Sequence, residues 1–72
     1  MSFQLVRAED TEIAVWNVEY GHIFTFSIPA KARELVPGPI RDVPGADEGA
    51  TTLKDAALRF ATAEARSRQL IR

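Results

Sequence analysis

The chain has 72 residues, a net charge of −1 and no cysteine, with 46% hydrophobic and 26% charged residues. This length predicts a single domain over residues 1–72, and the balanced composition argues against wholesale disorder. The missing cysteines exclude disulfides and cysteine-based zinc sites, and the lone histidine excludes a histidine-rich metal site.

The sequence gives no sign of a membrane segment or a targeting peptide. No apolar run approaches the ~20 residues that span a bilayer. The N-terminal residues lack the basic start and the long apolar core of a signal peptide. We therefore expect a cytoplasmic protein that does not enter a membrane.

The first half of the chain predicts three antiparallel strands. Residues 2–7 alternate polar and apolar side chains, residues 8–11 form a polar turn, and residues 12–28 read as a β-hairpin. Gly21 suits the left-handed position of a three-residue loop over residues 19–21. These segments together predict a three-stranded meander.

The loop length decides which hairpin residues meet. A three-residue loop places Trp16 opposite Phe24, and it puts the even-numbered residues of both strands on one face. That face is the more aromatic of the two, so it is predicted to be the inner one, with Trp16 in the core. The odd-numbered residues would then face outward.

The second half predicts a short helix, a loop and a long helix. Residues 30–36 are mostly good helix formers after Pro29, and residues 37–50 hold three of the four prolines and three of the four glycines. Residues 51–72 form the clearest helix, with a capping box that starts at Thr52 and an apolar stripe anchored by Phe60. The predicted fold class is α+β, with the long helix packed on the sheet.

The basic residues of the last segment have a structural explanation. The front of the chain is acidic and the back is basic, a pattern that can indicate nucleic-acid binding. Basic residues near a helix C-terminus also match the helix dipole, and Glu64 with Arg68 forms a favourable i,i+4 pair. The charge pattern is therefore expected of a stable surface helix.

No motif in the chain points to catalysis. His22 follows the hairpin turn and reads as an edge or turn residue, because no orienting partner is implied for a general base. The glycines form neither a phosphate-binding loop nor a dinucleotide fingerprint. We expect no enzyme activity, no catalytic residues, no metal site and no cofactor.

The function expected is that of a small binding or structural module. The outward residues Ile13, Val15 and Ile23 form a candidate protein interface, which would make a homodimer or bind another protein. Equally, a segment of the same chain could fold back over this face. The alternative function is nucleic-acid binding through Arg59 and Arg66, which share one side of the last helix.

Overall fold

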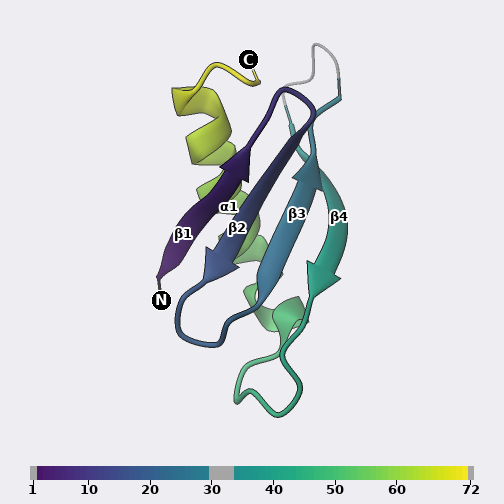
Figure 1. Cartoon of the computed structure of the whole chain (residues 1–72), viewed down its shortest axis with the longest axis vertical. Helices are drawn as coiled ribbons and strands as arrows, with labels where there is room; N and C mark the ends of the chain where they lie inside the picture. Colours follow the sequence, from purple (N-terminus) through teal and green to yellow (C-terminus); the bar gives the residue numbers. More distant parts are fainter. Residues whose placement is uncertain (1, 30–33, 72) are drawn as a thin grey trace.

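The protein is an antiparallel sheet of four strands with a helix across one face, as shown by a computed structural model that describes residues 2–29 and 34–71 (Figure 1). The strands lie side by side in chain order, so each one pairs with its sequence neighbour. Their bounds, with that of the helix, are β1 (Phe3–Ala8), β2 (Glu12–Asn17), β3 (Ile23–Ser27), β4 (Val36–Arg41) and α1 (Ala50–Ser67). The α+β class and the helix on the sheet are confirmed, whereas the prediction of three strands is wrong.

The hairpin of β2 and β3 closes through a longer loop than predicted. Asn17 pairs with His22 at the loop, donating its backbone N–H to the His22 carbonyl at 2.8 Å, and its own carbonyl accepts the Gly21 N–H at 2.7 Å. The Asn17 side chain Oδ1 accepts the Tyr20 N–H at 2.8 Å. Gly21 does adopt the predicted positive φ, at 84°. The loop therefore spans residues 18–21, one more than predicted.

Because of the extra loop residue, every β2 side chain lies on the opposite sheet face from the one predicted, while the β3 side chains keep theirs. The observed partner of Phe24 is Val15, and that of Trp16 is Ile23. Because side chains alternate along a strand, a one-residue change in register moves the whole strand's inner set to the other face. The prediction that Trp16 lies in the core is therefore wrong.

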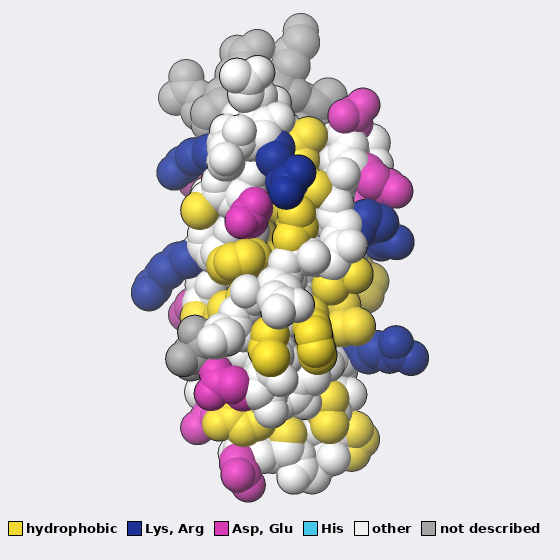
Figure 2. All heavy atoms as spheres, turned by 60° about the vertical axis from the view of Figure 1, so that its left-hand side comes forward, with side chains coloured by type: hydrophobic (Ala, Val, Ile, Leu, Met, Phe, Trp, Pro, Cys, Tyr) yellow, Lys and Arg dark blue, Asp and Glu magenta, His cyan; other side chains and the backbone are white. Residues whose placement is uncertain are grey.

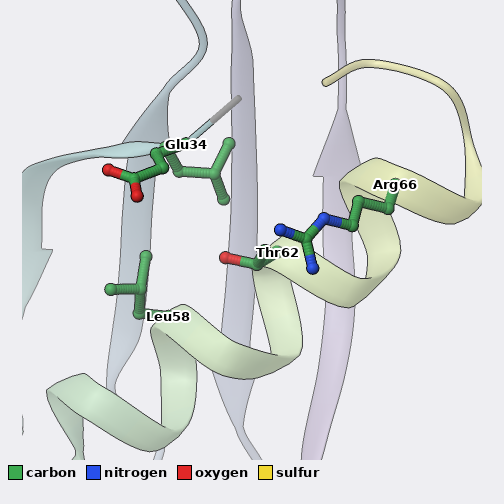
Figure 3. Close-up of a pocket in the computed structure, with 5 residues that line it drawn as sticks. Glu34, Leu58, Thr62 and Arg66 are labelled. Atoms are coloured by element: carbon green, nitrogen blue, oxygen red, sulfur yellow. The ribbon is translucent and has the colours of Figure 1, made fainter. Parts of the chain in front are cut away.

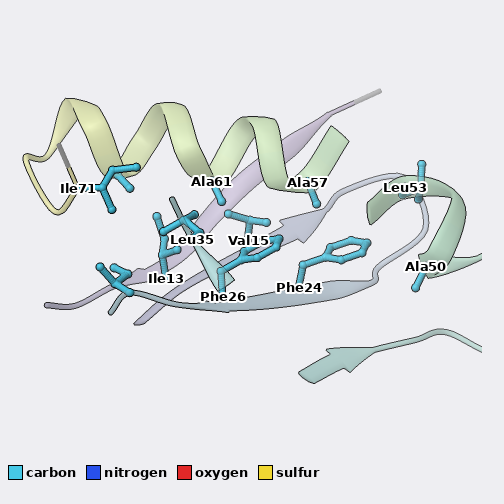
Figure 4. Packing of buried hydrophobic residues seen from close by; sticks show 12 residues of the cluster. Ile13, Val15, Phe24, Phe26, Leu35, Ala50, Leu53, Ala57, Ala61 and Ile71 are labelled. Atoms are coloured by element: carbon cyan, nitrogen blue, oxygen red, sulfur yellow. The ribbon is translucent and has the colours of Figure 1, made fainter. Parts of the chain in front are cut away.

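The core lies between the sheet and α1 (Figure 4). It takes the odd-numbered residues of β2 and the even-numbered residues of β3, all close to fully buried. From the strands these are Ile13, Val15, Phe24 and Phe26, and from α1 they are Ala50, Leu53, Ala57, Ala61 and Ala65. The helix residues recur every four positions from Leu53, and the alanines among them allow close approach to the sheet.

The proline- and glycine-rich segment forms a strand where we predicted only a loop. The prediction of a loop over residues 37–50 is wrong for its first part, because β4 runs through both prolines there. Proline lacks an N–H, and sheets tolerate it on edge strands such as this one. Gly38 sits at an irregularity in the β3–β4 pairing, where an added Cβ would lie 2.9 Å from the Thr25 carbonyl oxygen.

The short helix predicted over residues 30–36 falls mostly outside the described residues. Residues 30–33 are not described, Glu34 and Leu35 are not helical, and Val36 already belongs to β4. Leu35 is buried in the core. The described part of the segment therefore leads directly into β4, and none of it is helical.

The long helix is confirmed, with corrected ends. Gly49 is the N-cap and makes no side-chain cap, so the capping box predicted at Thr52 is wrong. The helix stops at Ser67 because Gln69 turns left-handed at φ 62°, and the Leu70 N–H donates to the Ala65 carbonyl at 2.8 Å. The predicted pair of Glu64 and Arg68 is present at 3.5 Å.

Candidate protein-binding face

The sheet face turned away from α1, here called the helix-free face, has Trp16 at its centre. The strand register aligns one row of side chains across this face: Gln4, Trp16, Ile23 and Arg41. Trp16 and Ile23 are half-buried, while Gln4 and Arg41 at the row's two ends are exposed. The row therefore has an apolar centre and polar ends.

Further apolar and charged groups surround this row. Val6, an extra residue in an irregular stretch of β1, is 55% exposed, and Val36 at the start of β4 is 48% exposed. Arg7 and Glu12 form an ion pair at 2.8 Å near the same end of the sheet. In Figure 2, which brings the β1 side of the molecule forward, hydrophobic side chains form a broken band with basic groups projecting on both borders.

The structure separates the three residues of the predicted interface. Ile13 and Val15 have no exposed surface and lie beneath α1, so the expectation that they face outward is wrong. Their place follows from the β2–β3 register described above. Ile23 lies on the helix-free face beside Trp16, a residue that sequence reasoning had assigned to the core.

The two arginines of the nucleic-acid hypothesis are both exposed on α1. Arg66 lines a pocket of about 260 Å³, together with Glu34, Leu35, Leu58 and Thr62 (Figure 3). Glu34 lies at the opposite end of this pocket, and its carboxylate points away from the Arg66 guanidinium. Arg59 is not part of the pocket lining. The arrangement therefore leaves Arg66 in a mixed-charge setting.

His22 lies next to the turn, as one of its two predicted places had it, but its side chain is buried with no exposed surface. Its Nε2 lies 2.7 Å from the Glu48 carbonyl oxygen, and since a carbonyl only accepts, Nε2 carries a proton. Its Nδ1 lies 3.0 Å from the Val43 nitrogen and 2.9 Å from Asp42 Oδ1. The ring thereby fastens the loop over residues 42–49 to the hairpin.

The bonds of His22 to the loop over residues 42–49 also shape one side of the helix-free face. Val43, held by His22, lies close enough to Gly21 that an added Cβ there would meet Val43 Cγ2 at 3.4 Å and Trp16 Nε1 at 3.9 Å. The loop after β4 thus borders the indole ring of Trp16. The sequence held a signal for this register. Asn17 and His22 are both polar, and each stands next to one member of the Trp16–Ile23 pair, so a turn between them pairs polar with polar and apolar with apolar residues.

No helix within residues 2–29 and 34–71 combines the length and the apolar character needed to cross a membrane. In the same residues, histidine and carboxylate side chains nowhere gather in a group of three that could hold a metal ion. Comparisons of the chain with protein-family models, with curated proteins and with solved structures found no match, so the geometry alone carries the functional proposal.

Proposed function

We propose that the chain is a non-enzymatic binding module that contacts another protein through the helix-free face. The observation that carries the proposal is the pair of Trp16 and Ile23 at the centre of a face that α1 does not cover. One face of an antiparallel sheet is often solvated, and such a face usually carries polar residues. A tryptophan beside an isoleucine is the composition of an interface centre, because tryptophan is enriched among residues that dominate binding energy.

The surroundings of this pair support the same function. Val36, which pairs with Ser27, extends the exposed apolar surface to β4, and Gln4 and Arg41 supply polar groups at its border. An apolar centre with a polar rim is the usual anatomy of protein–protein interfaces. Catalysis is not part of the proposal, since the lone histidine is buried and bonded to the loop after β4.

The test uses the wild type and two variants as bait in quantitative affinity capture. The proteins are captured from a cytoplasmic extract of the native cell, because the cytoplasm is the predicted location. Ile23→Lys places a charge at the centre of the helix-free face, and Ala63→Lys places the same charge on the exposed side of α1. A protein captured by the wild type and by Ala63→Lys, but at least about tenfold less by Ile23→Lys, supports the proposal. Its affinity is then measured by titration with purified components. Captured sets that are identical for all three forms contradict it.

The nucleic-acid alternative predicts a different result. Binding to phosphates weakens steeply with added salt, whereas apolar contact does not. Arg59→Ala combined with Arg66→Ala would abolish phosphate binding and leave contacts at the helix-free face intact. Because an acidic residue, Glu34, lines the same pocket as Arg66 and Arg59 does not, the geometry supports this alternative less well. Salt-sensitive binding of DNA or RNA that the double variant loses would favour it over a protein partner.

A further inference from the structure

The two outer strands of the sheet present very different edges. Along β4, Pro37 and Pro39 have no N–H to donate, and the pairing with β3 is irregular around Gly38. Prolines and irregular pairing are two of the devices that keep a sheet edge from pairing with another chain. The other outer strand, β1, contains no proline, and within the described residues no strand lies beyond it.

The hydrogen-bond pattern shows which β1 groups point outward. The Val18 N–H donates to the Ser2 carbonyl at 3.0 Å, so these two residues form a hydrogen-bonded pair. Bonded and non-bonded pairs alternate along antiparallel strands, which makes Gln4 and Trp16 the next bonded pair. Phe3 and Leu5 lie between these positions, so their N–H and C=O groups point away from β2. The irregularity after Leu5 ends this outward row.

We propose that two copies of the chain associate by antiparallel pairing of β1 with β1, around a two-fold axis at Gln4. In this register Phe3 of each copy lies opposite Leu5 of the other. Each such pair exchanges two main-chain hydrogen bonds, so all the outward groups of Phe3 and Leu5 find partners. The occupant of the edge is thus a second copy, because the short outward row is complementary to itself when reversed.

The side chains on both sides of the edge fit the same register. On the α1 side, Phe3 and Leu5 are half-buried, and Phe60 stacks on Phe3 with ring centroids 5.8 Å apart. Pairing places Phe3 against Leu5 of the second copy, which extends the core across the axis. On the other side, the exposed Gln4 meets its own copy, and an amide carries both donors and an acceptor.

Charge does not oppose this pairing. The one charged residue of β1 is Arg7, and its guanidinium is bonded to Glu12 within the same chain at 2.8 Å. In the proposed register Arg7 lies beyond the paired segment, so no like charges face each other across the axis. Hydrophobic side chains are exposed along the β1 side of the molecule, which is the side that the second copy would cover (Figure 2).

The pairing would create one continuous sheet of eight strands from two sheets of four. A two-fold axis perpendicular to a sheet keeps each face on its own side, so both α1 helices lie on one side and both helix-free faces on the other. The pairing does not rest on the proposed function, because it uses an edge and not a face. If both hold, the dimer presents two Trp16 residues on one surface.

The test measures the solution mass of the full chain by light scattering across a dilution series. A short strand pair buries little surface, so a concentration-dependent dimer is expected. Gln4→Lys and Gln4→Glu each place like charges at the axis, and each is expected to raise the dissociation constant about tenfold or more. An equimolar mixture of the two variants is expected to recover the dimer as a heterodimer, because opposite charges then meet. Both substitutions are at an exposed position, so each variant is expected to keep the fold, which circular dichroism checks.

Two further readouts make the outcome decisive. Hydrogen exchange is expected to show the Phe3 and Leu5 amides protected at high concentration and exchanging rapidly on dilution. Ile23→Lys is expected to leave the dimer intact, because Ile23 lies on the helix-free face and away from the edge. A monomer at every concentration up to about 1 mM overturns the proposal. So does a dimer that Ile23→Lys abolishes and Gln4→Lys does not, a result that would assign self-association to the helix-free face.

Discussion

The two faces of the central hairpin differ in what their largest side chains do. On the covered face, Phe24 and Phe26 of β3 are almost fully buried against α1. On the helix-free face, Trp16 is the largest residue and is only half-buried, beside Ile23. The difference teaches that size and aromaticity do not by themselves identify an inner face. The hydrogen bonds at the turn set the register, and the register then assigns each face.

The largest expected change in the free energy of unfolding comes from a residue of the covered face, and a residue of the helix-free face should give a smaller one. Phe24→Ala removes a side chain with no exposed surface, so we expect it to lower the free energy of unfolding by about 3–5 kcal/mol. Trp16→Ala removes a half-buried side chain, and we expect a loss of no more than about 2 kcal/mol. Urea unfolding monitored by circular dichroism measures both.

Phe24→Leu provides a milder version of the same test if Phe24→Ala does not fold. It removes less volume and keeps an apolar side chain in the core. A Trp16 variant that is destabilised more than either Phe24 variant would contradict the assignment of the two faces. Partly solvated fluorescence from Trp16 in the folded wild type is expected on the same grounds.

The sequence places Phe24 and Phe26 of β3 in the core correctly, but the predicted register turns the wrong face of β2 inward. The hairpin, the left-handed Gly21 and the long helix all follow from local signals that act within a few residues. The register depends on whether Asn17 belongs to the strand or to the loop. Its Oδ1 bond to the Tyr20 N–H settles that question, and a side-chain bond of this kind competes with the strand ladder in a way that alternation does not reveal.

The fourth strand was missed for a different reason. Prolines normally argue against a strand, and Pro37 and Pro39 stand close together in β4. An edge strand needs donors on one side only, so the pairing of β4 with β3 survives at Val36 and Arg41. The candidate face was found only in part, through Ile23, because its central residue Trp16 depends on the same register that sequence reasoning misjudged.

The next effect tests the turn that sets the register. Asn17→Ala leaves the Tyr20 N–H without its partner in a partly buried site. Losing such a bond is expected to cost about 1–3 kcal/mol. Val18→Ala is the matched control, since Val18 is a neighbouring exposed residue and its loss is expected to change the free energy of unfolding by less than about 0.5 kcal/mol. Equal effects of the two substitutions would show that the Asn17 side chain does not hold the turn.

A smaller or similar effect is expected at the irregular β3–β4 pairing. In Gly38→Ala the new Cβ would lie 2.9 Å from the Thr25 carbonyl oxygen, so the backbone must shift, at a cost of about 1–3 kcal/mol. At Gly49 an added Cβ meets nothing within 4 Å, so Gly49→Ala is expected to cost only the difference between glycine and alanine at an N-cap, about 1 kcal/mol or less. Thermal unfolding of both variants compares a crowded glycine with an open one. If Gly38→Ala were as stable as the wild type, β4 would have to be able to move away from β3 at little cost in free energy.

The smallest effect is a gain in stability at the end of α1. Gln69 holds a left-handed backbone, at φ 62°, so that the Leu70 N–H can reach the Ala65 carbonyl and Ile71 can be buried. A non-glycine residue in this conformation costs about 1–2 kcal/mol, part of which glycine would recover after its own larger entropy loss on folding. Gln69→Gly is therefore expected to raise the free energy of unfolding by about 0.5–1 kcal/mol in urea titrations.

Gln69→Ala, which keeps the left-handed strain, is the control and is expected to show no such gain. Because neither substitution touches the helix-free face or the β1 edge, both variants are expected to match the wild type in the two binding tests proposed above, whatever their outcome.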